Sequence, residues 1–204
     1  MMIAIVASYA QSASQAKAVL DKTSALLTKD SGIRATFKLS NYENNRAIGE
    51  VNGTLSMKGD RFLLETPGIT TWFNGITQWT YLTESEEINI SKPTEEELQL
   101  VHPYTFIHLY RKGYNCSLVG TVTYKGKKTY KIEMTPQDKR SDVKRILLWI
   151  TCQSHQPTAI EIAMTDGHRQ VVEVTSFANG QKFYDSKFTL NTKLYPQAEI
   201  IDLR

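Results

Sequence analysis

Residues 53–82 read GTLSMKGDRFLLETPGITTWFNGITQWTYL, and this stretch decides the fold class. Its apolar runs are rich in β-branched and aromatic side chains, and they are separated by Lys58-Gly59-Asp60 and by Asn74-Gly75. Glycine at such positions supplies the positive φ that tight hairpins require. Links this short join antiparallel neighbours, because a parallel connection needs a dozen residues or more. The stretch therefore predicts an antiparallel meander.

The same signature continues on both sides of this stretch. At 33–39 apolar residues alternate with polar ones, which is the pattern of a strand with one buried and one solvated face. Glycine-containing turns at 125–127 and 166–167 again separate apolar runs. By these criteria strands are expected at 33–39, 46–58, 61–66, 70–73, 76–82, 86–90, 114–119, 128–134, 143–152, 159–164 and 168–177.

One helix is expected before the strands and two short ones within them. Apolar residues recur at helical spacing over 14–29, and Gly32 lies just past the end of that run. Thr94 and Glu97 form a capping box, so a helix is expected to begin there. Pro103 suits the first turn of a further helix. Together with a long antiparallel sheet, which must curl, these helices give an α+β class.

The composition is that of an ordinary globular protein. The chain has 204 residues, of which 41% are hydrophobic and 22% charged, so one domain over 14–204 is expected. The net charge of +3 is small, and the electrostatic field that it produces is too weak to predict a nucleic-acid partner. Outside the N-terminus the longest apolar run, 146–152, falls far short of the ~20 residues that a membrane-spanning helix needs. The chain is therefore not expected to span a membrane.

Residues 1–13 are expected to be a signal peptide or the remnant of one. The segment MMIAIVASYA is apolar, and Ser8 and Ala10 are placed like the small pair before a signal-peptidase site. No Lys or Arg precedes the apolar run, which favours a remnant or a start site assigned too late. The other interpretation is a short buried N-terminal strand. No cysteine follows the run, so no lipid anchor is expected.

The cysteines do not predict a disulfide scaffold or a zinc site. The chain has two, Cys116 and Cys152, whereas a structural zinc site needs four clustered ligands. Both alternate with apolar residues and are expected on the buried faces of strands. An oxidising compartment would allow them to bridge. Buried free thiols are nevertheless favoured, because buried cysteine commonly behaves as a small hydrophobic residue.

The sequence contains none of the common catalytic motifs. The sequence lacks a nucleophile elbow, a zinc-protease motif, a dinucleotide fingerprint and a phosphate-binding P-loop. Its four histidines are scattered, and the spacing of Cys152 and His155 matches no known nucleophile and base. We therefore expect no enzyme, no catalytic residue, no metal and no cofactor.

Large apolar side chains are the most conspicuous feature that remains. The concave face of a curled sheet must be filled by the protein's own side chains or by a guest molecule. On pattern alone, packing in the core is favoured over a guest, because large residues at strand spacing mostly pack against covering helices. The periodicity does not decide the question.

Several motifs, taken in order, resemble the LolA-like family of periplasmic outer-membrane lipoprotein carriers, as a divergent branch. The resemblance covers nearly the whole of 14–204. The motifs are Gly53-x-Leu55, the Phe62 strand after Lys58-Gly59-Asp60-Arg61, Asn74-Gly75 followed by Trp79-x-Tyr81, His102-Pro103-Tyr104, and Lys187-Phe188-x-Leu190 leading to Asp202-Leu203-Arg204.

The resemblance implies an incomplete antiparallel β-barrel with helices covering its concave face. Acylated lipoprotein or a related lipid would be sheltered beneath this lid, received from an inner-membrane donor complex and passed to an outer-membrane acceptor. The protein would act in the periplasm as a monomer. Family carriers often have a basic residue that tethers the lid, and here Arg61 is the candidate latch. The residues expected to line the cavity and lid are Phe37, Leu39, Leu55, Met57, Phe62, Leu64, Trp72, Trp79, Tyr81, Phe106, Leu109, Tyr110, Trp149, Ile160 and Ile162.

Two other function classes stay open at this point. A periplasmic sensor of the same fold would bind lipid or lipoprotein and regulate a partner without transport. An enzyme acting on lipids is disfavoured by the missing nucleophile elbow.

Overall fold

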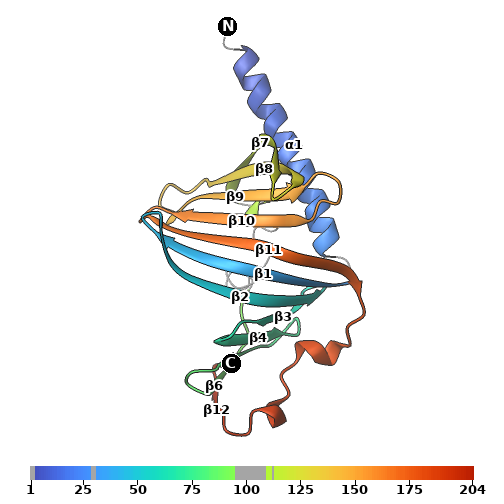
Figure 1. Ribbon diagram of the computed structural model, residues 1–204, viewed down its shortest axis with the longest axis vertical. Helices are drawn as coiled ribbons and strands as arrows, with labels where there is room; N and C mark the ends of the chain where they lie inside the picture. The colour runs from blue at the N-terminus through green and yellow to red at the C-terminus, as the bar shows by residue number, and fades with distance from the viewer. Residues whose placement is uncertain (1–2, 29–30, 95–108, 112) are drawn as a thin grey trace. The chain divides into compact units, whose positions relative to one another are not determined.

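The computed structural model describes residues 3–28, 31–94, 109–111 and 113–204, with side chains described from residue 11 onward. The chain forms two compact units (Figure 1). Unit 1 is drawn from Met1–Leu26, Lys38–Glu50 and Phe106–Val174, and unit 2 from Leu27–Phe37, Val51–Thr105 and Thr175–Arg204. Each unit is built from segments far apart in the sequence.

The N-terminal helix α1 runs over Ile3–Leu27 and confirms the helix expected at 14–29. It starts earlier than expected, within the residues assigned to a signal peptide, and that assignment stays a prediction. In unit 1 its buried face carries Ala16, Val19, Leu20 and Thr23, which recur at helical spacing. Ser12 Oγ donates a hydrogen bond to the Leu118 carbonyl at 3.0 Å, which ties the helix to a strand of the same unit.

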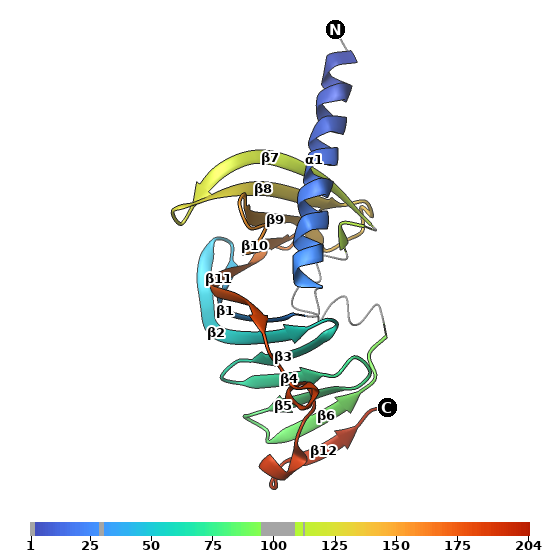
Figure 2. The same ribbon diagram turned by 90° about the vertical axis from the view of Figure 1, so that its right-hand side faces the viewer.

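The strands form a 12-stranded sheet in the order β12-β6-β5-β4-β3-β2-β1-β11-β10-β9-β8-β7. Within the described chain the order ends at β12 and β7, so the sheet is unclosed, and Figure 2 shows β7 and β8 strongly curved. The strands are β1 Gly32–Glu43, β2 Arg46–Lys58, β3 Arg61–Glu65, β4 Ile69–Phe73, β5 Gln78–Leu82, β6 Glu87–Ser91, β7 Tyr114–Tyr124, β8 Lys127–Pro136, β9 Val143–Thr151, β10 Pro157–Met164, β11 His168–Gln181 and β12 Glu199–Asp202.

The pairing is antiparallel, as predicted, with one difference at an edge. β2 to β6 pair as successive antiparallel neighbours, and so do β7 to β11. β12, for which no strand was predicted, pairs in parallel with β6. It follows two short 3-10 helices, η1 Asp185–Phe188 and η2 Thr192–Leu194. We call residues 182–198 the C-terminal segment.

The core of unit 1 lies on one face of β7 to β10. Side chains of cross-strand partners share a face, because successive residues of a strand point to opposite sides. Ile132 of β8, Leu148 of β9 and Ile160 of β10 are such partners and are at most 7% exposed. We call this side the Ile160 face; it also carries Met134, Ile146 and Ile162.

Both cysteines are free thiols and half-buried. Cys116 pairs with Met134 across β7 and β8 and so shares the Ile160 face. Burial raises its pKa to about 11, which leaves the thiol protonated and unreactive near neutral pH.

Candidate functional site

Unit 2 has a sheet with two apolar faces, and the strand register separates them. Leu55 lies opposite Leu64, and Met57 opposite Phe62, so these residues share one side, the Leu55 face. Leu63 lies opposite Trp72, which lies opposite Trp79, so these residues share the other side, the Trp72 face. The cavity residues expected from the sequence are therefore divided between the two sides.

The Leu55 face is continuous across β2, β3 and β4. Leu55, Met57 and Phe62 are at most 3% exposed, whereas Leu64 is half-buried. The ring centroid of Phe62 lies 5.6 Å from that of Phe73 on the neighbouring strand. Besides these aliphatic, thioether and phenyl groups, the same side carries Thr71 opposite Leu64 and Gln78 opposite Phe73, so the face is mainly apolar. Its apolar part suits a hydrocarbon.

Phe37 of β1 joins this face through a glycine. A Cβ atom on Gly53 would clash with Cζ of Phe37, so the phenyl ring lies directly over this residue. Gly53 alternates with Leu55 and hence faces the same side. The Gly53-x-Leu55 motif is therefore explained by packing. Leu39, two residues beyond Phe37 on β1, is half-buried.

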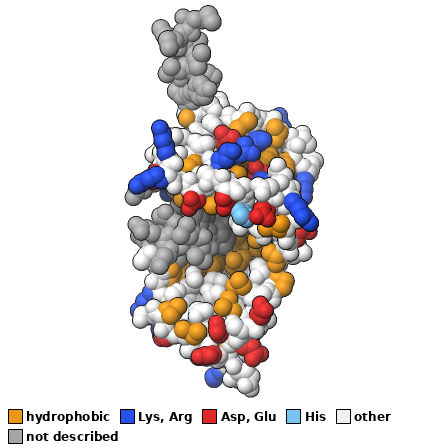
Figure 3. Space-filling view, turned by 90° about the vertical axis from the view of Figure 1, so that its left-hand side faces the viewer, with side chains coloured by type: hydrophobic (Ala, Val, Ile, Leu, Met, Phe, Trp, Pro, Cys, Tyr) orange, Lys and Arg blue, Asp and Glu red, His pale blue; other side chains and the backbone are white. Residues whose placement is uncertain are grey.

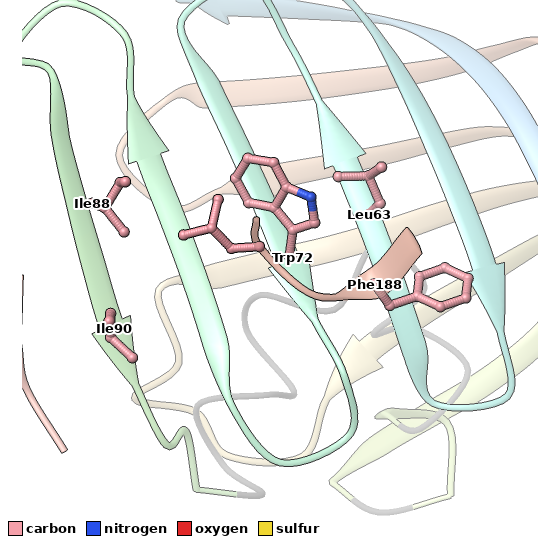
Figure 4. Packing of buried hydrophobic residues seen from close by; sticks show 6 residues of the cluster. Leu63, Trp72, Ile88, Ile90 and Phe188 are labelled. Carbon is pink, nitrogen blue, oxygen red and sulfur yellow. The ribbon is translucent and has the colours of Figure 1, made fainter. Parts of the chain in front are cut away.

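The Trp72 face is covered by the protein's own C-terminal segment. The ring of Tyr195 lies 5.8 Å from that of Trp72 and 4.5 Å from that of Tyr81. Phe188, which is fully buried, belongs to the same cluster as Leu63 and Trp72. Figure 4 shows Leu63, Trp72, Ile88 and Ile90 on the side of the strands along which the Phe188 segment passes. Trp79 and Tyr81 pack against this cluster.

Arg61, the candidate latch, contacts the C-terminal segment. Its NH1 atom lies 2.5 Å from Asp185 Oδ1, and Lys58 Nζ lies 3.2 Å from the same oxygen. Lys58 Nζ also donates to the Phe183 carbonyl at 3.3 Å. Arg61 and, to a lesser extent, Lys58 lower the pKa of the Asp185 carboxyl. Two cations thus hold the beginning of the segment that covers the Trp72 face.

We expect Asp185→Asn to loosen the C-terminal segment, because it removes the charge shared by both cations. Hydrogen exchange of residues 182–198 should become faster by on the order of a few-fold, as expected for exposed ion pairs. Because the pKa of Asp185 is lowered in the folded protein, its ionised carboxyl stabilises the fold at pH values above the ordinary carboxyl pKa of about 3.9. This stabilisation is lost as the pH falls through the folded-state pKa of Asp185. The wild type should therefore lose protection of this segment at acidic pH, and Asp185→Asn should lose less.

Asp138→Asn is the matched control, because Asp138 also forms an exposed ion pair, with Arg140 at 3.1 Å, but belongs to unit 1. Equal exchange of residues 182–198 in Asp185→Asn and wild type would show that the ion pairs do not hold the segment.

In unit 1 the expected site residues again fall on two sides. Ile162 lies opposite Ile146 and Ile160 opposite Leu148, so both point to the Ile160 face. Trp149 lies opposite Ala159 and Lys131 and so points to the other side. Its ring lies 5.2 Å from that of Tyr124, and Lys131 Nζ lies 5.4 Å from its centroid.

Tyr110 is anchored to helix α1. Its hydroxyl donates to Asp21 Oδ1 at 2.5 Å and accepts from Arg111 Nε at 3.1 Å. Lys17 and Tyr110 lower the pKa of Asp21, and burial raises that of Tyr110. Leu109 is half-buried. The two short helices expected after Thr94, with Phe106, fall largely on 95–108 and lie outside the described residues.

In the described part of the chain, three or more His, Cys, Asp or Glu side chains nowhere gather as a metal ion requires. Among the same residues, no helix combines the length and the apolar character needed to cross a membrane. Figure 3 shows hydrophobic side chains at the surface beside acidic ones, as is common on folded proteins.

Sequence reasoning missed the role of the C-terminal segment. Lys187-Phe188-x-Leu190 was noted as a motif, but its apolar residues were not expected to cover the strands that carry Trp72 and Trp79. Alternation of Phe188 with Leu190 was the available signal. Asp185, the partner of Lys58 and Arg61, carried no sequence signal.

Comparison with protein families gives one match, over residues 6–168, to the family described as outer membrane lipoprotein carrier protein LolA. Comparison with curated proteins gives no match.

Solved structures similar to this chain include an uncharacterized conserved protein from Thermus thermophilus, with 15% identity, a TM-score of 0.64, and coverage of 92% of this chain and 99% of that one. A DUF1329 family protein from Desulfovibrio piger has 10% identity and a TM-score of 0.52, covering 87% and 97% of the two chains. LprF from Mycobacterium bovis has 12% identity and a TM-score of 0.51, covering 84% and 95%. At such identities the similarity concerns the fold.

Proposed function

Because the chain belongs to the LolA family of outer membrane lipoprotein carrier proteins, we propose that it is a periplasmic carrier that shelters lipoprotein acyl chains or a related lipid. It would act without catalysis and without a cofactor. The observation that supports this role most directly is the Leu55 face, a mainly apolar layer of side chains on the opposite side of the sheet from the one that the C-terminal segment covers.

The energetics explain why such a carrier needs an apolar face. Exposing hydrocarbon to water costs about 0.8 kcal/mol for each CH₂ group, so an acyl chain of about a dozen methylenes represents on the order of 10 kcal/mol. Aliphatic and aromatic side chains can replace water around the chain without leaving a polar group unsatisfied. We assign acyl contact to the Leu55 face in unit 2 and to the Ile160 face in unit 1, with helices covering the cargo.

The same assignment gives another role to the aromatic residues of the Trp72 face. Trp72, Trp79 and Tyr81 hold the C-terminal segment, and Trp149 lies on the other side of its strand from Ile160. In this proposal they stabilise the protein and do not contact cargo.

Transfer requires partners at both membranes. Tight binding alone cannot release cargo, so a receiver must favour the emptied state. An inner-membrane donor complex would load the carrier and an outer-membrane acceptor would unload it, with the carrier itself a monomer. A sensor that binds lipid without transfer would lack the second step.

The proposal predicts that Leu64→Gln and Ile162→Gln weaken binding of a fluorescent fatty acyl probe about tenfold each. An amide left without a partner against hydrocarbon costs about 1–3 kcal/mol, and 1.4 kcal/mol corresponds to a factor of ten. Both residues are half-buried, so the fold should tolerate the change. Probe titration measures the effect, and native mass spectrometry of the purified wild type should detect co-purified lipid.

Tyr81→Gln and Trp149→Gln are the matched controls, because these side chains are also half-buried. Tyr81 lies on the Trp72 face and not on the Leu55 face, and Trp149 lies on the side of its strand away from the Ile160 face. They should bind the probe as the wild type does. Loss of binding in the controls, with full binding in Leu64→Gln and Ile162→Gln, would reject the assignment of the faces. Absence of probe binding by the wild type would reject the carrier function.

A further inference from the structure

The side of unit 2 that carries the Leu55 face changes its chemistry from one strand to the next. On β2, β3 and β4 it presents Leu55, Phe62 and Phe73, which are at most 3% exposed. On β5 the first two residues of the same side are Gln78, opposite Phe73, and Thr80. An apolar area is thus followed, within one sheet, by hydrogen-bonding side chains.

These polar side chains continue onto β6. Ser91 lies opposite Gln78, and Asn89 lies opposite Thr80. Both side chains are half-buried and neutral. An acidic residue of this side, Glu87, stands at the other end of β6 from Ser91. A ligand group beside Gln78 would therefore meet neutral hydroxyl and amide groups on the two strands.

One oxygen among these polar groups is buried without a hydrogen-bond partner. In the described part of the chain, Gln78 Oε1 and Ser56 Oγ are the buried side-chain oxygens that have none. Ser56 lies opposite Leu63 and so points to the Trp72 face. The hydroxyls of Thr71 and Thr80, by contrast, lie 3.5 Å apart and can satisfy each other. Gln78 Oε1 is therefore the unpartnered acceptor on the side of the Leu55 face.

A buried amide oxygen without a partner costs free energy, because it has given up its hydrogen bonds to water. Cargo on the Leu55 face could supply the missing donor. Neighbouring strands lie about 5 Å apart, so a polar group attached to an acyl chain that lies over Phe62 and Phe73 can reach Gln78 within a few bonds. The position of the oxygen beside the apolar area thus suits an amphipathic ligand.

We propose that Gln78 Oε1 accepts a hydrogen bond from the cargo, and that this cargo is an acyl chain joined directly to a neutral donor such as an amide N–H. The inference rests on the proposed carrier function and deepens it. The Leu55 face holds the chain, and Gln78 selects and orients the group at its polar end. A ligand without a donor would leave the oxygen unpartnered and would bind more weakly.

The test compares two ligands that differ by one donor. N-methyldodecanamide carries an amide N–H, and N,N-dimethyldodecanamide has the same acyl chain without it. Each is titrated in competition with the fluorescent fatty acyl probe. The variant Gln78→Met keeps a side chain of similar length and removes the acceptor. The ratio of the dissociation constant of the dimethyl amide to that of the methyl amide should be about tenfold larger in wild type than in Gln78→Met, as expected for one buried hydrogen bond.

Gln156→Met is the matched control, because Gln156 is also half-buried but lies in the turn between β9 and β10, in unit 1. Its ratio of dissociation constants should equal that of the wild type. Equal ratios in wild type and Gln78→Met, or an equal loss in the control, would overturn the proposal while leaving the carrier function intact. A wild type that binds neither amide nor the probe would reject the carrier function, and this proposal with it.

The stability of Gln78→Met provides a second measurement. Chemical denaturation should show the variant to be at least as stable as the wild type, because the substitution removes a buried oxygen that has no partner. A clear loss of stability would show that Gln78 Oε1 is already satisfied within the protein, and would overturn the proposal independently of any ligand.

Discussion

Phe188→Ala should destabilise the protein by about 3–5 kcal/mol, the usual cost of removing a fully buried phenyl ring. Phe188 has 0% exposure and belongs to the cluster of Leu63, Trp72 and Ile88. Its loss would leave a cavity beneath the C-terminal segment, and the adjacent ring of Phe183, whose centroid lies 5.9 Å away, would lose its edge contact. Chemical denaturation followed by tryptophan fluorescence measures the change, since Trp72 and Trp79 report on this side of the sheet.

Tyr184→Ala provides the comparison for Phe188→Ala. It removes an aromatic ring from the same segment, but the side chain of Tyr184 is 87% exposed, so the free energy of unfolding should change by less than about 0.5 kcal/mol. Similar stabilities for the two variants would mean that the C-terminal segment does not pack as described.

Leu148→Ala should cost about 2–5 kcal/mol in unit 1. Leu148 is 1% exposed and lies between Ile132 and Ile160 on the neighbouring strands, so the surroundings can close the cavity only in part. Leu194→Ala is the control, because this leucine is 72% exposed and should be close to neutral. Denaturant melts give the loss of stability, and a neutral Leu148→Ala would contradict the placement of the Ile160 face.

Hydrogen exchange in these variants also tests the number of domains. The boundary between the two units falls within β1, β2 and β11, so each of these strands contributes to both. We propose on this basis that residues 14–204 unfold as one domain. Phe188→Ala should then lower the protection of β9, and Leu148→Ala that of β4. Loss of protection confined to the mutated unit would instead indicate two independently folding domains.

Most of the strands could be predicted because alternation and turn signals agree along the chain. The strand expected at 46–58 is observed as β2 with the same bounds. At 76–82 the observed strand β5 begins later, at Gln78, because Asn74 Oδ1 accepts hydrogen bonds from the amides of Ile76 and Thr77 and keeps them in the turn. The long-range part of the fold gave no such signal: the parallel pairing of β12 depends on a contact with β6, far away in sequence.

The face on which each large side chain lies could not be predicted, for a specific reason. Trp72 and Phe73 are consecutive and both at most 8% exposed, so β4 carries buried aromatic side chains on both sides. Alternation of apolar and polar residues therefore does not predict which of the two side chains packs against the C-terminal segment. The same holds for Leu148, Trp149 and Ile150 in the continuous apolar run of β9. Only the cross-strand register, which a single sequence does not contain, separates them.

The late position of the C-terminal segment has a consequence for biosynthesis. The residues that cover Leu63, Trp72 and Ile88 are made long after the strands that carry those side chains. During synthesis, β3 to β6 can form hairpins with their local neighbours. The Trp72 face of these strands stays exposed to solvent until Phe188 has been synthesised and packs against it. A chain that lacks the C-terminal segment would expose Leu63, Trp72 and Ile88 and would be prone to self-association.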